Sequence, residues 1–373
     1  MRVCKAWYAL ACPFLYEYII LGRNRVLAPL CDALSRAALE NRQVGWWTER
    51  LDVQMRDATE TPHTVFATLA DILTYLPNLC ILTFSITGHG FASSMPNIIL
   101  NSVTSSGSLK CVHWYNRITM PLALHWTAFL QRHPEIESLD GKVATTPNAH
   151  IKLDAVKIVH GYPIGTRRRA VWSTIDLPAV RSMFYDLTCG IETDDAVTFS
   201  RLGQNLTDIQ LGFFEYDHLE LRVPRFRFAL DRIRAECARL TRVVLAVHSW
   251  SMLGPYTTTL PPTVHTLGIR VVCGQISEAS IKKLFNGFLP SFIVCNPAIK
   301  TIKFMEARNS RALRSHPVLL WHGLRDMEKL GVAIKDLDDR LILPPSCPSV
   351  VHLQQQFDKL SPTSTLEALT PTS

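Results

Sequence analysis

Histidine, aspartate and glutamate are the residues of this sequence that could bind a metal or transfer a proton. The thirteen histidines show neither a His-x-x-x-His nor a His-Glu-x-x-His spacing, which metal sites on helices need. Asp194-Asp195 and Asp338-Asp339 are adjacent carboxylates, whereas acid–base catalysis needs two groups placed across a cleft. The spacing therefore predicts no catalytic residue, no metal site and no bound cofactor.

Arginine is concentrated in two places. Arg167, Arg168 and Arg169 are consecutive, and seven arginines lie between Arg222 and Arg242. On a helix over residues 224–237, the arginines fall opposite the apolar positions, as on a solvated outer face. The formal charge of the chain is only +7, which permits an acidic partner without requiring one. Nucleic acid is therefore not favoured as a partner.

The composition is that of an ordered protein with a buried core. The chain has 373 residues, of which 47% are apolar and 19% are charged. These values exclude a mainly disordered, collagen-like or disulfide-scaffold protein. The length fits either two ordinary domains or one array of repeats.

The cysteines and the N-terminus bear on the compartment. The ten cysteines form no Cys-x-x-Cys pair, and most lie in apolar runs, where they are expected to act as small buried hydrophobic residues. Unpaired thiols suit the reducing cytosol or nucleus. No apolar stretch reaches the roughly 20 residues of a membrane span. Pro13 interrupts the first apolar run, which disfavours a secretory signal.

One pattern recurs along the chain: an apolar residue, two others, a second apolar residue and often a third two positions later. Six copies carry a proline two residues before the first apolar position, where proline ends a helix and favours extended backbone. Each copy is therefore predicted to be a short strand that follows a helix. The pairs are Leu79/Leu82, Leu109/Val112, Ile136/Leu139, Val156/Val159, Val180/Met183, Leu206/Ile209, Leu240/Val243, Val264/Leu267, Ile299/Ile302 and Val350/Leu353.

Segments with helical periodicity lie between these predicted strands. Apolar residues at helical spacing predict helices over residues 65–76, 122–130, 226–237 and 281–288. A further helix is expected after Ser315 as its cap, with Pro317 in its first turn. Most pairs recur at intervals in or just above the 20–29 residues of leucine-rich repeats. The sequence thus predicts an α/β fold in the form of an irregular leucine-rich-repeat-like solenoid, with short parallel strands alternating with helices.

A doubly wound α/β domain is the alternative fold, because it also alternates strands and helices. It usually carries a glycine-rich turn between strand and helix, and the chain has no Gly-x-Gly-x-x-Gly, P-loop or Gly-x-Ser-x-Gly motif. Prolines in phase with the strands favour the solenoid.

The N-terminal segment resembles the C-terminal half of an F-box, as found in fungal F-box proteins with divergent leucine-rich repeats. The resemblance rests on Val3-Cys4-Lys5-Ala6-Trp7, on Leu10-Ala11 and on Pro13-Phe14-Leu15-Tyr16-Glu17. It implies that Val3, Cys4, Trp7 and Leu10 face the Skp-type adaptor of a cullin–RING ubiquitin ligase. The Leu-Pro-containing first half of the motif is not in the sequence, which suggests a truncated gene model or a remnant that caps the repeats. In the alternative interpretation, Trp7 and Leu10 pack against the first repeat.

The expected organisation is a partial F-box-like segment over residues 1–22, a solenoid over 23–360 and a flexible tail over 361–373. One face of a curved repeat sheet is exposed, and the strand register assigns seven residues to it. Their mixed charge and their aromatic and methionine side chains suit the binding of a protein, although they could simply solvate the sheet. This predicted partner-binding face comprises His113, Phe184, Asp186, Gln210, Arg270, Lys303 and Met305.

The sequence thus favours a non-enzymatic recognition protein, an F-box-like receptor that holds an unknown protein substrate near a ligase. A repeat scaffold without a ligase link is the first alternative. An α/β enzyme, which requires a deep pocket with convergent polar groups, is the second.

Overall fold

A computed structural model describes residues 5–55, 62–85, 96–103, 107–114, 121–140, 150–161, 175–186, 199–213, 219–253, 259–273 and 276–342. The chain divides into two compact units. The first comprises residues 1–244 and 259–264, and the second comprises residues 245–258 and 265–373. The predicted boundaries at residues 22 and 360 stay predictions.

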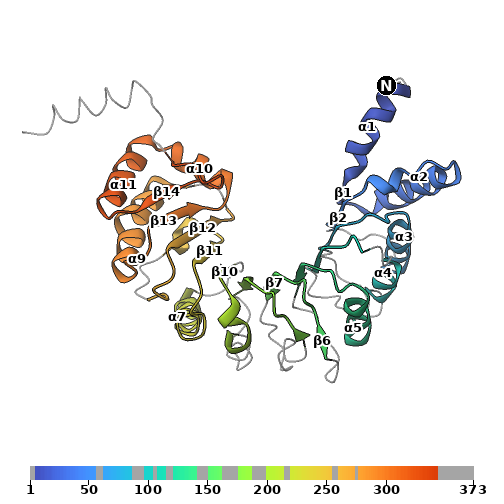
Figure 1. The fold of residues 1–373 in the computed structure, drawn as a ribbon. Helices are drawn as coiled ribbons and strands as arrows, with labels where there is room; N and C mark the ends of the chain where they lie inside the picture. Colours follow the sequence, from blue (N-terminus) through green and yellow to red (C-terminus); the bar gives the residue numbers. More distant parts are fainter. Residues whose placement is uncertain are drawn as a thin grey trace, which may run out of the picture. The chain divides into compact units, whose positions relative to one another are not determined.

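Parallel strands form the sheet of the first unit (Figure 1). They hydrogen-bond in the order β1-β2-β3-β4-β5-β7-β9-β10, which is the order of the chain. The strands are β1 (Tyr18–Leu21), β2 (Arg50–Val53), β3 (Ile81–Phe84), β4 (Cys111–Trp114), β5 (Ser138–Asp140), β7 (Ile158–Gly161), β9 (Ser182–Asp186) and β10 (Asp208–Phe213). β6 (Ile151–Lys152) and β8 (Ile175–Asp176) form a separate parallel pair.

The helices that the structure describes in the first unit alternate with the strands along the sequence. α1 (Lys5–Glu17) precedes β1 and α7 (Leu219–Glu236) follows β10. Between these strands lie α2 (Leu27–Leu39), α3 (Pro62–Thr74), α4 (Pro96–Ser102) and α5 (Ala123–Arg132). Helices α2 to α5 follow one another along the same side of strands β1 to β4 (Figure 1). The core of this part lies between the helices and the strands, where Phe66, Leu69 and Ile72 of α3 are fully buried.

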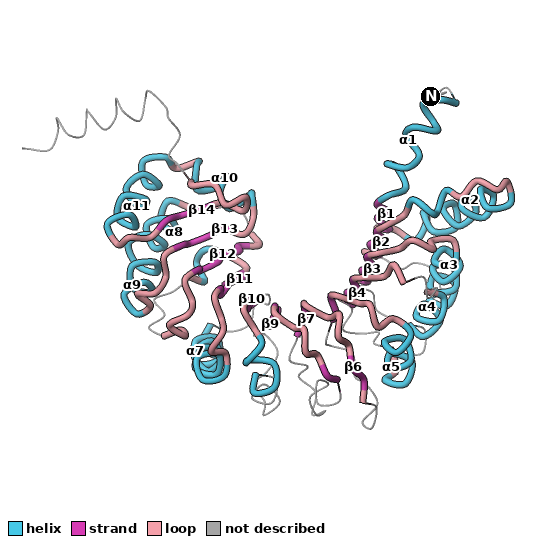
Figure 2. The backbone as a smooth tube through the Cα atoms, viewed as in Figure 1, coloured by secondary structure: helices cyan, strands magenta, loops and turns pink. Residues whose placement is uncertain are grey.

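The second unit repeats the arrangement. β12 (Thr266–Val271), β13 (Thr301–Phe304) and β14 (Ala333–Lys335) are parallel and adjacent in chain order. Helices α8 (Glu278–Lys283), α9 (Leu289–Cys295) and α11 (Pro317–Lys329) lie on one side of them (Figure 2). α10 (Ala307–Arg314) precedes α11, and a π-helical turn, Leu284–Phe288, joins α8 to α9. β11 (Arg242–Val247) contains the boundary between the two units.

The predicted apolar pairs are confirmed as core residues wherever the structure describes them. All nine pairs from Leu79/Leu82 to Ile299/Ile302 are at most 3% exposed. The large third residues are buried as well, among them Phe84, Trp114 and Phe304. Val350/Leu353 lies outside the residues described. Apolar spacing alone therefore located nine strands and the face that each one buries.

Two backbone motifs recur at these strands. The N–H of the first apolar residue donates to the carbonyl three residues earlier, as Leu79 does to Leu76 and Ile299 does to Asn296. The next two N–H groups donate to one carbonyl of the preceding strand segment. Through this second motif Glu49, Cys80, Lys110, Glu137, Lys157, Arg181, Thr207 and Thr241 are linked in series in the first unit.

The strand order is not that of a doubly wound sheet. Such a sheet reverses its strand order at a switch point, whereas in both units the order follows the chain. One local expectation was wrong: His316, not Ser315, precedes α11, and Ser315 ends α10. The strand β14 was missed, because Val332 and Ile334 lie within a 51-residue interval without a proline-marked pair.

Candidate interaction surfaces

Helix α1 carries apolar side chains on the side turned away from the core. Trp7, Leu10 and Phe14 are spaced three and four residues apart, so they share one face of the helix. Their exposed fractions are 65%, 67% and 79%. Cys12, on a different side of α1, is 1% exposed. Most of the Trp7 and Leu10 surface is therefore exposed to solvent, and their packing against the first repeat stays a prediction. Val3 and Cys4 lie outside the described residues.

A pocket of about 640 Å³ lies beside α1. Cys12 contributes to it from the helix, and Trp46 and Trp47 contribute from the 3₁₀ turn Val44–Trp47. Asn78 fixes this turn by donating from Nδ2 to the Trp46 carbonyl over 2.8 Å. Both tryptophans are partly exposed, at 49% and 39%. This end of the first unit thus combines an exposed apolar helix face with a pocket bordered by indole rings.

The second candidate surface of the first unit is the polar face, defined by Asp52, Thr83, His113, His160, Phe184 and Gln210. These residues alternate in their strands with the buried core residues, so they point away from the core. The parallel register places Asp52 beside Thr83, Thr83 beside His113, His160 beside Phe184 and Phe184 beside Gln210.

Aromatic contacts join the middle of the polar face. The His113 and His160 rings meet edge to face with centroids 4.5 Å apart, and the His160 and Phe184 rings stack with centroids 5.8 Å apart. The structure therefore places predicted residues His113, Phe184 and Gln210 in one row. Asp186 belongs to β9, but its side chain is outside what the structure describes.

His160 was missed in the prediction and lies between two predicted residues. It directly follows Val159, the second apolar residue of its repeat. The same relation to the apolar pair selects His113, Phe184 and Gln210, so the repeat pattern contains the signal for His160.

Asp52 is the charged residue that organises one end of the polar face. It is 1% exposed, yet its carboxylate accepts hydrogen bonds from Arg50 at 2.9 Å and from the Tyr18 hydroxyl at 2.5 Å. Burial favours its neutral form, but hydrogen bonds from Arg50, Tyr18 and Thr83 outweigh burial and lower the pKa of Asp52. The Arg50 guanidinium also lies 4.7 Å from the centre of the Tyr18 ring.

The same environment keeps His113 neutral. Burial, followed by the positive charge of Arg50, lowers the pKa of His113 from 6.5 to about 4, and the Asp52 carboxylate opposes this shift. At neutral pH His113 is therefore uncharged.

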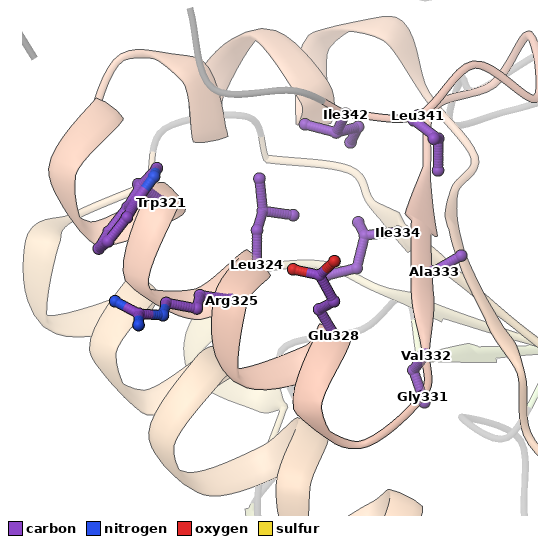
Figure 3. A pocket seen from close by; sticks show the side chains of 10 residues that line it. All are labelled: Trp321, Leu324, Arg325, Glu328, Gly331, Val332, Ala333, Ile334, Leu341 and Ile342. Carbon is purple, nitrogen blue, oxygen red and sulfur yellow. The ribbon is translucent and has the colours of Figure 1, made fainter. Parts of the chain in front are cut away.

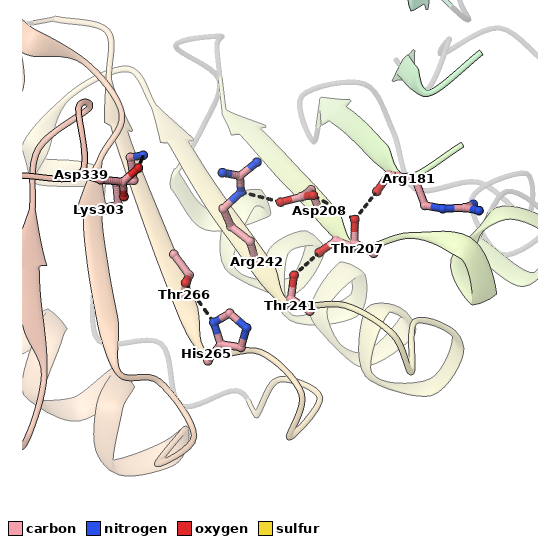
Figure 4. Close-up of polar contacts among 9 residues, drawn as sticks. All are labelled: Arg181, Thr207, Asp208, Thr241, Arg242, His265, Thr266, Lys303 and Asp339. Atoms are coloured by element: carbon pink, nitrogen blue, oxygen red, sulfur yellow. Dashed lines mark hydrogen bonds and ion pairs between the residues drawn. The ribbon is translucent and has the colours of Figure 1, made fainter. Parts of the chain in front are cut away.

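In the second unit, Arg270, Lys303 and Met305 also alternate with core residues. Arg270 forms an ion pair with Glu306 at 2.7 Å. Lys303 forms one with Asp339 at 2.8 Å (Figure 4). Burial opposes ionisation of Glu306, but Arg270 and Arg308 outweigh it and lower its pKa. Arg270 and Lys303, two charged residues of the predicted partner-binding face, are thus already paired within this unit.

The strand starts of the first unit form a polar edge (Figure 4). Thr207 Oγ1 donates to the Arg181 carbonyl and Thr241 Oγ1 donates to the Thr207 carbonyl, each over 3.1 Å. Arg242 pairs with Asp208 at 2.5 Å. Because these bonds join residues of neighbouring strands, they fix the strand register at this edge.

A second pocket, of about 650 Å³, lies between α11 and β14 in the second unit (Figure 3). Leu324, Ile334 and Ile342 supply apolar surface, and Arg325 and Glu328 are the charged residues of its lining. Arg325 stacks over Trp321 with its guanidinium carbon 5.3 Å from the ring centre. The lining is thus mainly apolar, with one cationic and one anionic side chain, Arg325 and Glu328, on the same helix.

Across the described part of the chain, no group of three or more His, Cys, Asp or Glu residues could hold a metal ion. None of the helices in those ranges is both long and apolar enough to cross a bilayer. No known family model matches the sequence, and a search of curated proteins finds no match either.

Proposed function

We propose that this chain is a non-catalytic recognition protein, with an irregular leucine-rich-repeat-like solenoid as its binding module. The recurrent backbone motifs, the strand order within each unit and the helices along one side of the strands support this fold. In such an array each unit contacts its neighbours in sequence, and the strands present an extended surface.

The role that we propose for the array is that of an F-box-like substrate receptor. The observation that carries this proposal is the exposed apolar face of α1 formed by Trp7, Leu10 and Phe14. Large apolar side chains clustered on one exposed helix face are typical of protein-binding sites. The Skp-type adaptor is the proposed partner of α1, and the polar face is the proposed site for a protein substrate. The ligase supplies the covalent chemistry.

Purified Skp-type adaptor tests the link to the ligase. We expect the full chain to bind it and the double variant Trp7→Ala/Leu10→Ala to bind at least tenfold more weakly, because buried interface anchors each contribute more than about 1 kcal/mol. Leu39→Ala is the matched control, since Leu39 is a large apolar residue that is 81% exposed on a different helix, α2. Equal loss in the control, or equal binding by all three proteins, contradicts the assignment of α1.

The second candidate function is a repeat scaffold without a ligase link. In this candidate function, the polar face with its contacting rings of His113, His160 and Phe184 still binds a protein, but α1 binds no adaptor. A full chain that is folded and shows no binding to the adaptor supports this candidate over the receptor.

A further inference from the structure

His248 and Cys273 form a side-chain pair in the second unit that none of the surfaces above uses. His248 directly follows β11, and Cys273 lies two residues after β12. The backbone pairing continues past both strands: the Val272 N–H donates to the Val247 carbonyl at 2.9 Å, and the Cys273 N–H donates to the His248 carbonyl at 2.7 Å. Both side chains are therefore held on a fixed backbone.

The thiol and the imidazole are within hydrogen-bonding distance. Cys273 Sγ lies 3.0 Å from Nε2 of His248 and 3.9 Å from Nδ1. Cys273 is exposed, so a reagent can approach the sulfur from solvent. A thiol next to an imidazole is the arrangement in which the base removes the thiol proton and produces the nucleophilic thiolate.

Four other thiols are in the opposite situation. Cys31, Cys80, Cys111 and Cys237 are buried or half-buried. At each of them burial is the largest cause of a raised thiol pKa, which reaches about 12 for Cys237. The general expectation of buried cysteines is thus wrong for Cys273, which is exposed.

We propose that Cys273 is a covalent modification site, where the thiol forms a mixed disulfide with a small disulfide and His248 acts as the base. His248 takes the thiol proton while the sulfur attacks one sulfur of the disulfide. A bond forms between Cys273 Sγ and that sulfur, and the original S–S bond breaks. The leaving thiolate keeps the bonding electron pair and takes the proton from the imidazolium. The products are modified Cys273 and one small thiol, so the small disulfide is the oxidant.

Glutathione disulfide is the probe for this site. The fully reduced full-length protein is exposed to it, quenched with acid at intervals and digested, and mass spectrometry measures the extent of modification at each cysteine. An isolated thiol is ionised to only about one part in a hundred at pH 6.5. We expect Cys273 to react about tenfold faster at this pH in the natural protein than in His248→Gln, because Gln is not a base.

Two controls make the result specific. His265→Gln removes another exposed histidine of the second unit and should leave the rate at Cys273 unchanged. In urea-unfolded protein the backbone no longer holds His248 beside Cys273, so the rates of the natural protein and of His248→Gln should converge. The proposal is overturned if His248→Gln, folded by circular dichroism, modifies Cys273 at the natural rate at pH 6.5. It is also overturned if both proteins show the same pH profile.

Discussion

Asn309 is the buried polar residue whose loss should most clearly weaken the second unit. It lies in α10, is 0% exposed and forms two hydrogen bonds with Val271 at the end of β12. Its Oδ1 accepts from the Val271 N–H and its Nδ2 donates to the Val271 carbonyl, both over 2.9 Å. Asn309→Ala removes both bonds and leaves two backbone groups of a buried residue without this partner.

The magnitude follows from the two groups that lose their partner. A buried donor or acceptor left unsatisfied costs about 1–3 kcal/mol. The Asn309→Ala variant no longer buries a polar amide, and this offsets part of the cost of the two unsatisfied groups. We therefore expect Asn309→Ala to lower the free energy of unfolding by about 2–4 kcal/mol. Asn296→Ala is the matched control. Asn296 is also buried, and its Nδ2 donates to the Phe292 carbonyl of α9 over 2.8 Å. Loss of one such hydrogen bond is expected to cost about 1 kcal/mol.

Hydrogen exchange followed by mass spectrometry measures this loss of stability peptide by peptide. A local measurement is needed because the chain has two compact units, which can unfold in separate transitions. A loss of 2–4 kcal/mol accelerates exchange in the β12 peptide roughly 30- to 700-fold, since each tenfold change corresponds to about 1.4 kcal/mol. Urea unfolding followed by circular dichroism provides the second measurement. Equal effects of Asn309→Ala and Asn296→Ala in both experiments would refute the assignment of two energetically important hydrogen bonds.

Three further substitutions test the packing and the polar face. Gly323→Ala should destabilise the second unit by about 1–2 kcal/mol, because a Cβ at this position lies 2.3 Å from the Phe285 ring. This loss is expected although alanine has the higher helix propensity. Adding Phe285→Leu to the same chain should recover part of the loss. Gly45→Ala should cost more than about 2 kcal/mol in urea unfolding, because its Cβ lies 2.0 Å from a backbone carbonyl oxygen after α3, whereas Gly22→Ala meets nothing within 4 Å and should cost little. His113→Gln should flatten the pH dependence of stability. In the folded protein the pKa of His113 is about 4, below its usual value of 6.5. The stability that neutral His113 contributes is therefore complete above pH 6.5 and is lost as the pH falls towards 4. The loss is at most about 3 kcal/mol, and urea titrations across this range that are identical for His113→Gln and the natural protein contradict it.

Local patterns in the sequence were sufficient to locate most of the repeated core. The apolar pairs predicted nine strands, because every pair combines a fixed spacing with a buried face. Strand β14 was not predicted: its core residue Ile334 lies in a stretch without a proline two positions before an apolar pair. β1 and β2 also lack a proline at this position.

The candidate sites depended more on contacts between distant residues. His113 and Phe184 were identified from their position after a core residue, and the same rule covers His160. Local spacing carries no information on the ion pairs of Arg270 and Lys303, whose partners lie 36 residues further along the chain. The His248–Cys273 pair, 25 residues apart, was likewise invisible, because it arises from the register of neighbouring backbones.

The order of the strands also has a consequence for how the protein is made. Within each unit, a strand pairs with one that was synthesised earlier, so its partner has already left the ribosome when it emerges. The closing loops are only tens of residues long, and the entropy of closing such loops grows slowly with their length. Assembly can therefore proceed in the direction of translation, with each completed strand offering a free edge to the next. A ribosome-bound chain that stops after β4 should already protect the backbone amides of β2 and β3 from hydrogen exchange.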